Sequence, residues 1–440
     1  VVQAGRSDSH FVLAPPLDPD TQGIQQLQKG FHIPDPGDVL KDHLFLREKS
    51  SCESGQSSVF VSGWSDGPLE RVTTFNDQTY PNFIGLLDEI GQESQPSTMS
   101  FSVQAGDGAL EYCGTTLNTV FAQRRNLVRP PFYRMLRDIL RFNRTALPST
   151  EHLGPDETLG EYLFDNGYSH EFVDHYLVPM AAAIWSAEPG SILEMPVSFL
   201  VRFFANHGLL SVNDQPQWRV IKGGSRQYVT KLVAGHRDRI RLNSPVQSVR
   251  RVDDRIEIQS ASGGRELFDF VFLACHSDQA MALIKDPTDV EREVLGAIRY
   301  QANEAVLHTD ASMMPRRKLA WAAWNYHIPR DTARHVAVTY NMNILQGLAS
   351  QKDYLVTLNS DRDIDPDKVI RRVHYEHPIF SRESVAAQRR QAEINCDRTF
   401  FCGAYWRNGF HEDGVVSSLD AVTHFQERLA HGQLHLRRAS

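Results

Sequence analysis

Near its C-terminus the chain reads FFCGAYWRNGFHEDGVVSSL over residues 400–419, and this stretch decides the fold. The apolar run 399–402 predicts a strand that is buried on both faces, and a helix follows it. Gly403, Gly409 and Gly414 lie between strand and helix, where glycine lets the backbone approach a ligand closely. The first N–H groups of a helix lack partners within it, and the helix dipole adds partial positive charge. The stretch therefore predicts a site for an anion or a dipolar acceptor, with an ordinary strand–turn–helix as the alternative.

Aromatic side chains accompany these glycines and a second glycine turn. Tyr405, Trp406 and Phe410 offer flat faces for an aromatic ring, or they fill the core. Gly223-Gly224-Ser225 opens a helix and could cradle a phosphate, although two glycines before a helix are common. In the run 321–326, Trp324 and Tyr326 share one face of a predicted strand. That face lines either a substrate cavity or the core.

Working outward, the chain changes texture several times. Residues 1–74 are rich in Ser, Gly, Pro and Asp, and only the run 59–61 suggests a strand there. The patterns favour helices at the following places: 80–90, 129–147, 159–163, 169–184, 199–206, 225–234, 277–284 and 413–429. They favour strands at these: 100–103, 110–112, 240–242, 246–252, 256–259, 268–274, 305–308, 320–326, 336–340, 354–358 and 399–402.

Composition limits the class of protein. The chain has 440 residues, of which 41% are hydrophobic and 23% charged, as is typical of a globular protein. Its net charge of −8 argues against sequence-independent binding of nucleic acid. The five cysteines are scattered, which argues against a disulfide framework and favours a reducing, cytoplasmic compartment. His276 and His411 lie nearest the predicted ligand turns, but neither has metal-ligand spacing, so we expect no metal.

Several stretches, in order, carry a resemblance to one family. From residue 75 to about 429 the chain resembles bacterial NAD/FAD-binding proteins of the flavin amine-oxidase superfamily, relatives of amine oxidases, phytoene desaturases and protoporphyrinogen oxidase. The matching stretches are 75–83, 121–125, 183–187, 217–225, 274–277, 320–326 and 401–414. Such a resemblance implies a two-domain α/β fold, with a discontinuous FAD-binding domain and an inserted, helix-rich substrate domain.

The resemblance also implies roles for individual residues. Val246 would contact the adenine side of FAD, and Ala274 with Cys275 would lie beside the cofactor. His411, Trp324 and Tyr326 would act at the substrate. The other expected cofactor-binding residues are Gly223, Gly224, Ser225, Gly403, Ala404, Tyr405, Trp406, Gly409, Phe410, Glu412, Asp413 and Gly414.

The N-terminal part departs from this family. The superfamily begins with a βαβ unit that carries Gly-x-Gly-x-x-Gly, and these 440 residues contain no such triplet. The run Gly106-Asp107-Gly108 lacks the third glycine and is typical of a hairpin turn. We expect that a frameshift or a faulty gene start replaced the βαβ unit; the alternative is a protein that has lost FAD binding.

These observations divide the chain as follows: 1–74 atypical and loosely ordered; 75–216 first, helical part of the substrate domain; 217–290 middle part of the FAD-binding domain; 291–395 second, β-rich part of the substrate domain; 396–430 last strand and helix of the FAD-binding domain; 431–440 tail.

We expect an FAD-dependent oxidoreductase that acts on a small molecule. Its substrate would be an amine or a lipid acyl chain, the latter because family members are often encoded beside cyclopropane-fatty-acid synthases. The alternatives are a non-catalytic remnant that no longer binds FAD and, with less support, an NAD(P)-binding enzyme. Peripheral contact with a membrane and the oligomeric state stay open.

Overall fold

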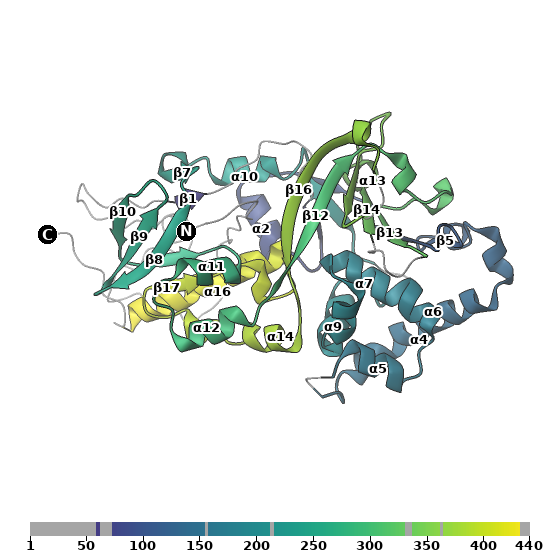
Figure 1. The fold of residues 1–440 in the computed structure, drawn as a ribbon, viewed down its shortest axis with the longest axis horizontal. Helices are drawn as coiled ribbons and strands as arrows, with labels where there is room; N and C mark the ends of the chain where they lie inside the picture. Colours follow the sequence, from purple (N-terminus) through teal and green to yellow (C-terminus); the bar gives the residue numbers. More distant parts are fainter. Residues whose placement is uncertain are drawn as a thin grey trace.

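The computed structural model describes residues 59–61, 73–154, 157–211, 215–330, 337–360 and 364–431, with the backbone alone for 59–61. The molecule is elongated and has two lobes, which lie left and right in Figure 1. Segments from the middle and the end of the chain, coloured teal and yellow, share the left-hand lobe. A large green sheet and the blue helices form the right-hand lobe. The mixed α/β architecture expected from the sequence is confirmed.

Two parallel strand pairs organise the left-hand lobe. Strand β11 (Val271–Leu273) pairs with β17 (Thr399–Phe401), so segments about 130 residues apart lie side by side, as expected from their largely apolar runs. Strand β1 (Val59–Val61) pairs in parallel with β7 (Ile240–Leu242). Around them lie an antiparallel sheet and five helices: β8 (Val246–Val252), β9 (Arg255–Ser260), β10 (Arg265–Phe268), α10 (Arg226–Leu232), α11 (Ser277–Leu283), α12 (Asp289–Gly296), α15 (Gln391–Ile394) and α16 (His411–Ala430).

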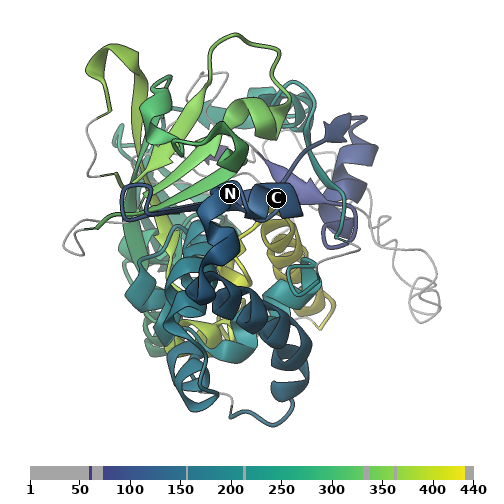
Figure 2. The ribbon, with the colours of Figure 1, turned by 90° about the vertical axis from the view of Figure 1, so that its right-hand side faces the viewer.

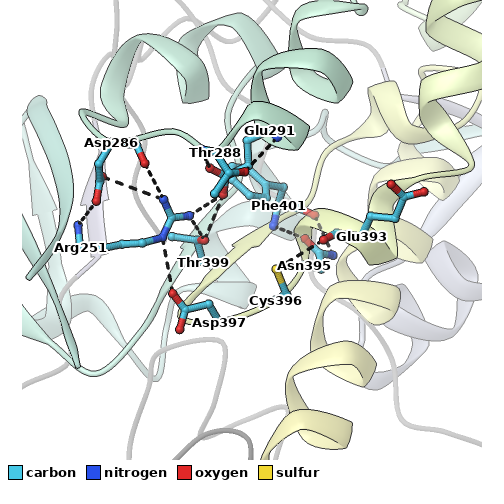
Figure 3. Close-up of polar contacts among 10 residues, drawn as sticks. All are labelled: Arg251, Asp286, Thr288, Glu291, Glu393, Asn395, Cys396, Asp397, Thr399 and Phe401. Atoms are coloured by element: carbon cyan, nitrogen blue, oxygen red, sulfur yellow. Dashed lines mark hydrogen bonds and ion pairs between the residues drawn. The ribbon is translucent and has the colours of Figure 1, made fainter. Parts of the chain in front are cut away.

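A partly buried arginine ties β8, α12 and β17 together (Figure 3). The guanidinium of Arg251 pairs with Glu291 and donates to Thr399 Oγ1 at 2.6 Å. It also donates to the carbonyl of Asp286 at 3.2 Å, and its Nε lies 3.7 Å from Asp397. Figure 3 shows all four partners converging on this one side chain, which therefore fixes the start of β17 relative to the rest of the lobe.

The right-hand lobe is built on a seven-stranded sheet in the order β16-β12-β15-β14-β13-β4-β5. Its strands are β4 (Phe101–Ala105), β5 (Leu110–Cys113), β12 (Tyr300–His308), β13 (Trp324–Ile328), β14 (Ala337–Asn341), β15 (Leu355–Leu358) and β16 (Val369–Pro378). The expected hairpin at Gly106-Asp107-Gly108 is confirmed, because β4 and β5 are antiparallel across this turn. Strand β13 pairs in parallel with β4, so two distant parts of the sequence complete one sheet.

Helices cover one face of this sheet and share its largest apolar cluster. They are α3 (Leu117–Val120), η1 (Arg124–Val128), α4 (Pro130–Ser149), α5 (Leu159–Asp165), α6 (His170–Phe172), η2 (Val173–Leu177), α7 (Val178–Trp185), α8 (Pro189–Glu194) and α9 (Val197–Asn206). Figure 2 shows them below the green strands. Pro130 and Pro131 start α4, where a missing N–H has no consequence.

Short elements complete the fold between and beside the lobes. A small sheet has the order β2-β6-β3 and lies next to the start of α2. The remaining bounds are β2 (Thr74–Asn76), α2 (Pro81–Glu89), β3 (Ser94–Pro96), β6 (Trp218–Ile221), η3 (Arg237–Arg239), η4 (Ala311–Met313), η5 (Lys318–Ala320), α13 (Met342–Gln346), η6 (Pro366–Lys368), α14 (Arg382–Gln388) and η7 (Ala404–Trp406).

Three sequence predictions are corrected. The strand expected at 320–326 begins only at Trp324, because 318–320 form a 3₁₀ turn. The single helix expected at 169–184 is divided by the π-helical turn η2, and Pro179 follows it at the start of α7. Residues 74–76, placed at the edge of the atypical segment, form β2. Most of 1–74 lies outside the described residues, but the short strand at 59–61 is confirmed.

No helix within the described ranges combines the length and the apolar character that crossing a bilayer requires.

Candidate functional site

The carboxyl ends of β11 and β17 meet at one edge of their parallel pair. The N–H of Cys402 donates to the carbonyl of Leu273 at 3.1 Å, so Ala274 and Cys275 leave β11 beside the point where Gly403 leaves β17. Parallel sheets bind ligands at this edge. Burial raises the pKa of the Cys275 thiol to about 12, so at neutral pH this side chain is a packed thiol and not a nucleophile.

Gly403 is needed where β17 ends, for a reason that the structure makes plain. A Cβ atom on this residue would lie 2.4 Å from the ring of Tyr405. Its N–H donates to Ser417 Oγ at 2.9 Å, which fastens the loop to α16. The loop is closed further on, where the N–H of Gly409 donates to the carbonyl of Ala404 at 3.1 Å. The loop is therefore a defined turn that aims the start of α16 at the ends of both strands.

Tyr405 and Trp406 are buried in the apolar cluster of the left-hand lobe, together with Val246 and Cys275. Of the two alternatives left open by the sequence, a face for an aromatic ligand or a place in the core, they take the place in the core. The Tyr405 hydroxyl and Trp406 Nε1 are nevertheless buried without a hydrogen-bond partner in the described part of the chain. Buried polar atoms are normally satisfied, so these two atoms are candidates for contact with a ligand, as are unpaired polar atoms elsewhere, such as Gln123 Oε1.

The carboxylates at the start of α16 are already occupied. Asp413 Oδ2 accepts from the N–H of Phe410 at 2.9 Å and so caps its own helix. Burial raises the pKa of the Asp413 carboxyl to about 6. Glu412 reaches across to α2, where it accepts from the N–H and side-chain amide of Asn82 at 3.1 and 2.6 Å and from the N–H of Phe83 at 2.8 Å. Glu412 thus joins the N-termini of two helices and does not point its charge at a ligand.

The glycine turn 223–225 is connected to the start of α16 by Thr73, a residue that no sequence pattern indicated. Gly223 and Gly224 have φ of 82° and 85°, which glycine adopts readily, and they connect β6 to α10. Ser225 Oγ lies 2.7 Å from Thr73 Oγ1, and Thr73 Oγ1 lies 3.0 Å from Nε2 of His411. Thr73 therefore connects the turn to the first residue of α16.

The three residues expected to act at the substrate divide into two groups. The ring of His411 lies 5.4 Å from that of Phe83, beside α2. Trp324 and Tyr326 lie on β13 and pack on the helical cluster of the other lobe. Trp324 Nε1 and the Tyr326 hydroxyl are also buried without a partner among the residues described. Burial raises the pKa of Tyr326 above its usual value, so its hydroxyl keeps its proton.

Phe410 lies where the two groups approach each other. It packs against the helical cluster and also against the cluster that contains Phe83. Its ring stacks on Phe203 of α9 at 5.2 Å. The indole of Trp185 donates to the carbonyl of Asn408 at 3.0 Å, which fastens the end of α7 to the same loop. The loop 403–414 therefore joins the two lobes, and aromatic rings of the helical lobe pack against it.

His207 is a further site residue that no sequence pattern indicated. It follows α9, stacks on Phe203 at 3.9 Å and lies 6.1 Å from Phe410. Its Nδ1 lies 2.9 Å from the carbonyl of Phe203, which can only accept, so Nδ1 carries the proton and Nε2 has a lone pair. Burial lowers the pKa of His207 to about 4, so the ring is neutral near pH 7.

This arrangement can be tested against the ring end and the phosphate end of a flavin dinucleotide. At the ring end the residues fit: two strand ends, a helix N-terminus and unsatisfied Tyr405 and Trp406 converge on one loop. At the phosphate end the glycine triplet of the family is missing from the sequence. In the described ranges, no group of three or more His, Cys, Asp or Glu could hold a metal ion.

Comparison with known proteins bears on the family and the fold, because the matched residues end before the loop 403–414. The family model described as flavin containing amine oxidoreductase matches residues 71–323, more than half of the chain. No curated protein sequence matches significantly.

Solved structures share the fold at low identity. Cyclohexylamine oxidase from Brevibacterium oxydans is 13% identical, with a TM-score of 0.57 over 85% of this chain and 94% of that one. Putrescine oxidase bound to putrescine is 14% identical, with a TM-score of 0.55 over 84% and 93%. The CLA-producing fatty acid isomerase from P. acnes is 14% identical, with a TM-score of 0.56 over 80% and 86%.

Proposed function

Because the chain belongs to the flavin-containing amine oxidoreductase family, we propose that it is an FAD-dependent oxidoreductase acting on an amine or a lipid acyl-type substrate. The observation that carries the proposal is the convergence of β11, β17 and the start of α16 on the loop 403–414. Bound FAD would supply the hydride acceptor. Everything else would be positioning and electrostatics from this chain.

The chain's own residues would hold the ring end. The backbone of the loop would approach the cofactor, and the N-terminus of α16 would stabilise negative charge that develops on the ring. Glu412 and Asn82 would keep that helix end in place, since they join it to α2. Trp324, Tyr326 and Phe410 would exclude water from the substrate side.

The polarity of the site bears on the choice of substrate. Both carboxylates at the start of α16, Glu412 and Asp413, are satisfied by backbone N–H groups. His207 is neutral and offers an acceptor atom among aromatic rings. A cationic amine would find no open carboxylate among these residues, which favours an apolar chain or an uncharged amine. The fatty acid isomerase of similar fold supports an apolar chain, and the two amine oxidases support an amine in general.

A second candidate, a remnant that does not bind FAD, is favoured by one observation. The sequence has no glycine triplet for the pyrophosphate. The hydroxyl of Ser225, which was expected at a phosphate, is hydrogen-bonded to the Thr73 hydroxyl and accepts from the Thr73 N–H. Under this reading the loop 403–414 serves only to join the lobes.

Flavin titration of the purified chain separates the two candidates. FAD and riboflavin are added in turn, binding is followed by flavin fluorescence, and anaerobic bleaching of the flavin band is then measured with a panel of amines and fatty acids. The enzyme predicts saturable FAD binding and bleaching by one substrate class. The variant Gly403→Ala should weaken binding, whereas Gly296→Ala, whose Cβ meets nothing within 4 Å, should not. Absence of binding for both flavins would establish the remnant.

We also propose a reducing, cytoplasmic compartment. All four cysteines in the described part of the chain, Cys113, Cys275, Cys396 and Cys402, are free thiols.

A further inference from the structure

One surface of the helical lobe differs in charge from the rest of the molecule. Residues 117–147 contain seven arginines and a single carboxylate, Asp138, a net charge of +6 in a chain whose net charge is −8. Asp138 is buried and accepts from the N–H and hydroxyl of Ser169, so it does not act at the surface. This segment forms α3, η1 and α4, which lie in the right-hand lobe, away from the sheet β8–β10 (Figure 1).

Helix α4 presents a stripe in which apolar and basic side chains alternate. Tyr133, Arg137, Leu140, Arg144 and Leu147 follow one another at steps of four and three residues, and all five are exposed. At about 100° per residue they occupy a strip roughly 80° wide, and it runs for about 21 Å along the helix. The most exposed apolar residue of the stripe is Leu140, at 59%. We call these five residues the α4 stripe.

The opposite face of α4 already packs into the core, so the apolar residues of the stripe are not needed there. Phe132, Met135, Phe142 and Ala146 are buried in the large apolar cluster, so the helix already has a complete inner face. The outer leucines therefore have no packing role in the described part of the fold.

The apolar surface continues beyond the N-terminus of α4. The Tyr133 hydroxyl donates to the carbonyl of Leu127 at 2.9 Å, which fixes η1 against the stripe. Val128 and Leu117 are 81% and 80% exposed. Large exposed apolar side chains on the successive elements α3, η1 and α4 are typical of an interaction site.

Four of the seven arginines have no carboxylate partner among the residues described: Arg124, Arg125, Arg129 and Arg144. Arg134 pairs with Glu171 at 2.8 Å, and Arg141 lies 3.8 Å from Asp138. Arg124 and Arg125 donate to backbone carbonyls and to the Asn118 amide oxygen, and not to carboxylates. Arg144 takes part in no ion pair among the residues described, and Arg137 lies 3.5 Å from the buried Asp138. A helix with leucine and tyrosine between arginines, lying flat, matches the boundary of an anionic bilayer, where apolar groups enter the acyl region and guanidinium groups meet phosphates.

We propose that the α4 stripe, with Leu117, Leu127 and Val128, is a docking surface for an anionic lipid membrane. The partner is identified by charge complementarity, since a basic, apolar strip on an acidic protein selects a surface that is both negatively charged and apolar beneath. The proposal goes beyond the proposed function and does not require a bound flavin.

The test is sedimentation of the full chain with vesicles of phosphatidylcholine alone or mixed with phosphatidylglycerol. We expect binding to the mixed vesicles, little binding to the neutral ones, and weakening by salt. Leu140→Gln combined with Arg144→Gln should weaken binding at least tenfold, because each basic residue alone contributes about fivefold. Both side chains are exposed, so the melting temperature should stay unchanged.

A matched double substitution on the edge strand β16 provides the control. Ile370→Gln combined with Arg372→Gln also removes one exposed apolar group and one arginine, but from β16. This variant should bind like the unmodified chain. Failure to bind mixed vesicles, or equal loss in both variants, would overturn the proposal. So would a concentration-dependent dimer that the α4 variant abolishes, because the surface would then belong to a second copy.

Discussion

Removing the guanidinium of Arg251 should destabilise the protein strongly, and the reason lies in its partner. Glu291 is 3% exposed at its side chain and Arg251 only 17%, so Arg251→Met leaves a carboxylate buried without its counter-charge. Breaking a buried pair in this way costs about 3–5 kcal/mol. The pair with Asp397, which is 62% exposed, adds no more than about 1 kcal/mol. We therefore expect the free energy of unfolding to fall by about 3–5 kcal/mol.

Adding Glu291→Gln to the same chain should restore part of this loss. A neutral amide still accepts through one oxygen from the N–H of Thr288, which Glu291 caps at 2.8 Å, but carries no buried charge. We expect the double variant to be more stable than Arg251→Met by about 1–2 kcal/mol, since the uncompensated charge is the main cost.

Urea unfolding followed by circular dichroism measures the stability of the single variant, the double variant and a control, Arg265→Met. Arg265 lies 3.9 Å from Glu257 and is 62% exposed, so its loss should change stability by no more than about 1 kcal/mol. A loss below about 1 kcal/mol for Arg251→Met, or a double variant less stable than the single one, would refute the reasoning about buried charge.

Three further predictions concern the site. Glu412→Gln should lower the unfolding free energy by about 1–2 kcal/mol, because charge-assisted hydrogen bonds to α2 become neutral; urea unfolding that shows no change would contradict this. His207→Phe should remove a pH dependence of the unfolding free energy. Because the pKa of His207 in the folded protein is below its usual value, the stability present above about pH 6.5 is lost toward pH 4, by about 3 kcal/mol. If the variant keeps the same dependence of unfolding free energy on pH, another group titrates. Gly403→Ala should shift the Tyr405 ring and lower flavin content measured by absorbance, whereas Gly296→Ala should do neither; equal flavin content in both would mean that the loop does not contact the cofactor.

The strands that the sequence predicted well are those with a strong local signal. The runs 268–274 and 399–402 are largely apolar, which is typical of strands covered on both faces, and their central parts do pair. The first of these strands begins only at Val271, because Phe268 ends β10. Strand β16 was not predicted, because it lies at the sheet edge and carries Arg371 and Arg372 where a central strand would carry apolar residues. Edge strands bury little, so their pattern resembles a loop.

The site was predictable only as far as backbone chemistry determines it. Glycines 403 and 409 mark the loop in the sequence because their conformations need glycine or a close approach. The partner of His411 is Thr73, 338 residues away, and no local pattern encodes such a contact. His207 is equally silent in the sequence, since its role comes from burial and from the carbonyl that fixes its tautomer.

The polar side chains around the loop lead to a conclusion about what the site can recognise. Glu412 is satisfied by α2, Asp413 by its own helix, and Ser225 by Thr73. Because each of these groups already has a partner, the features left for a ligand are the positive end of α16, the unsatisfied Tyr405 and Trp406, and aromatic rings from the other lobe. Such a site offers shape and a dipole but no open charge among these residues. Under the proposed function, a planar, electron-accepting ring would occupy one side and an apolar or uncharged substrate the other. The reactivity would then come from the cofactor and the selectivity from packing.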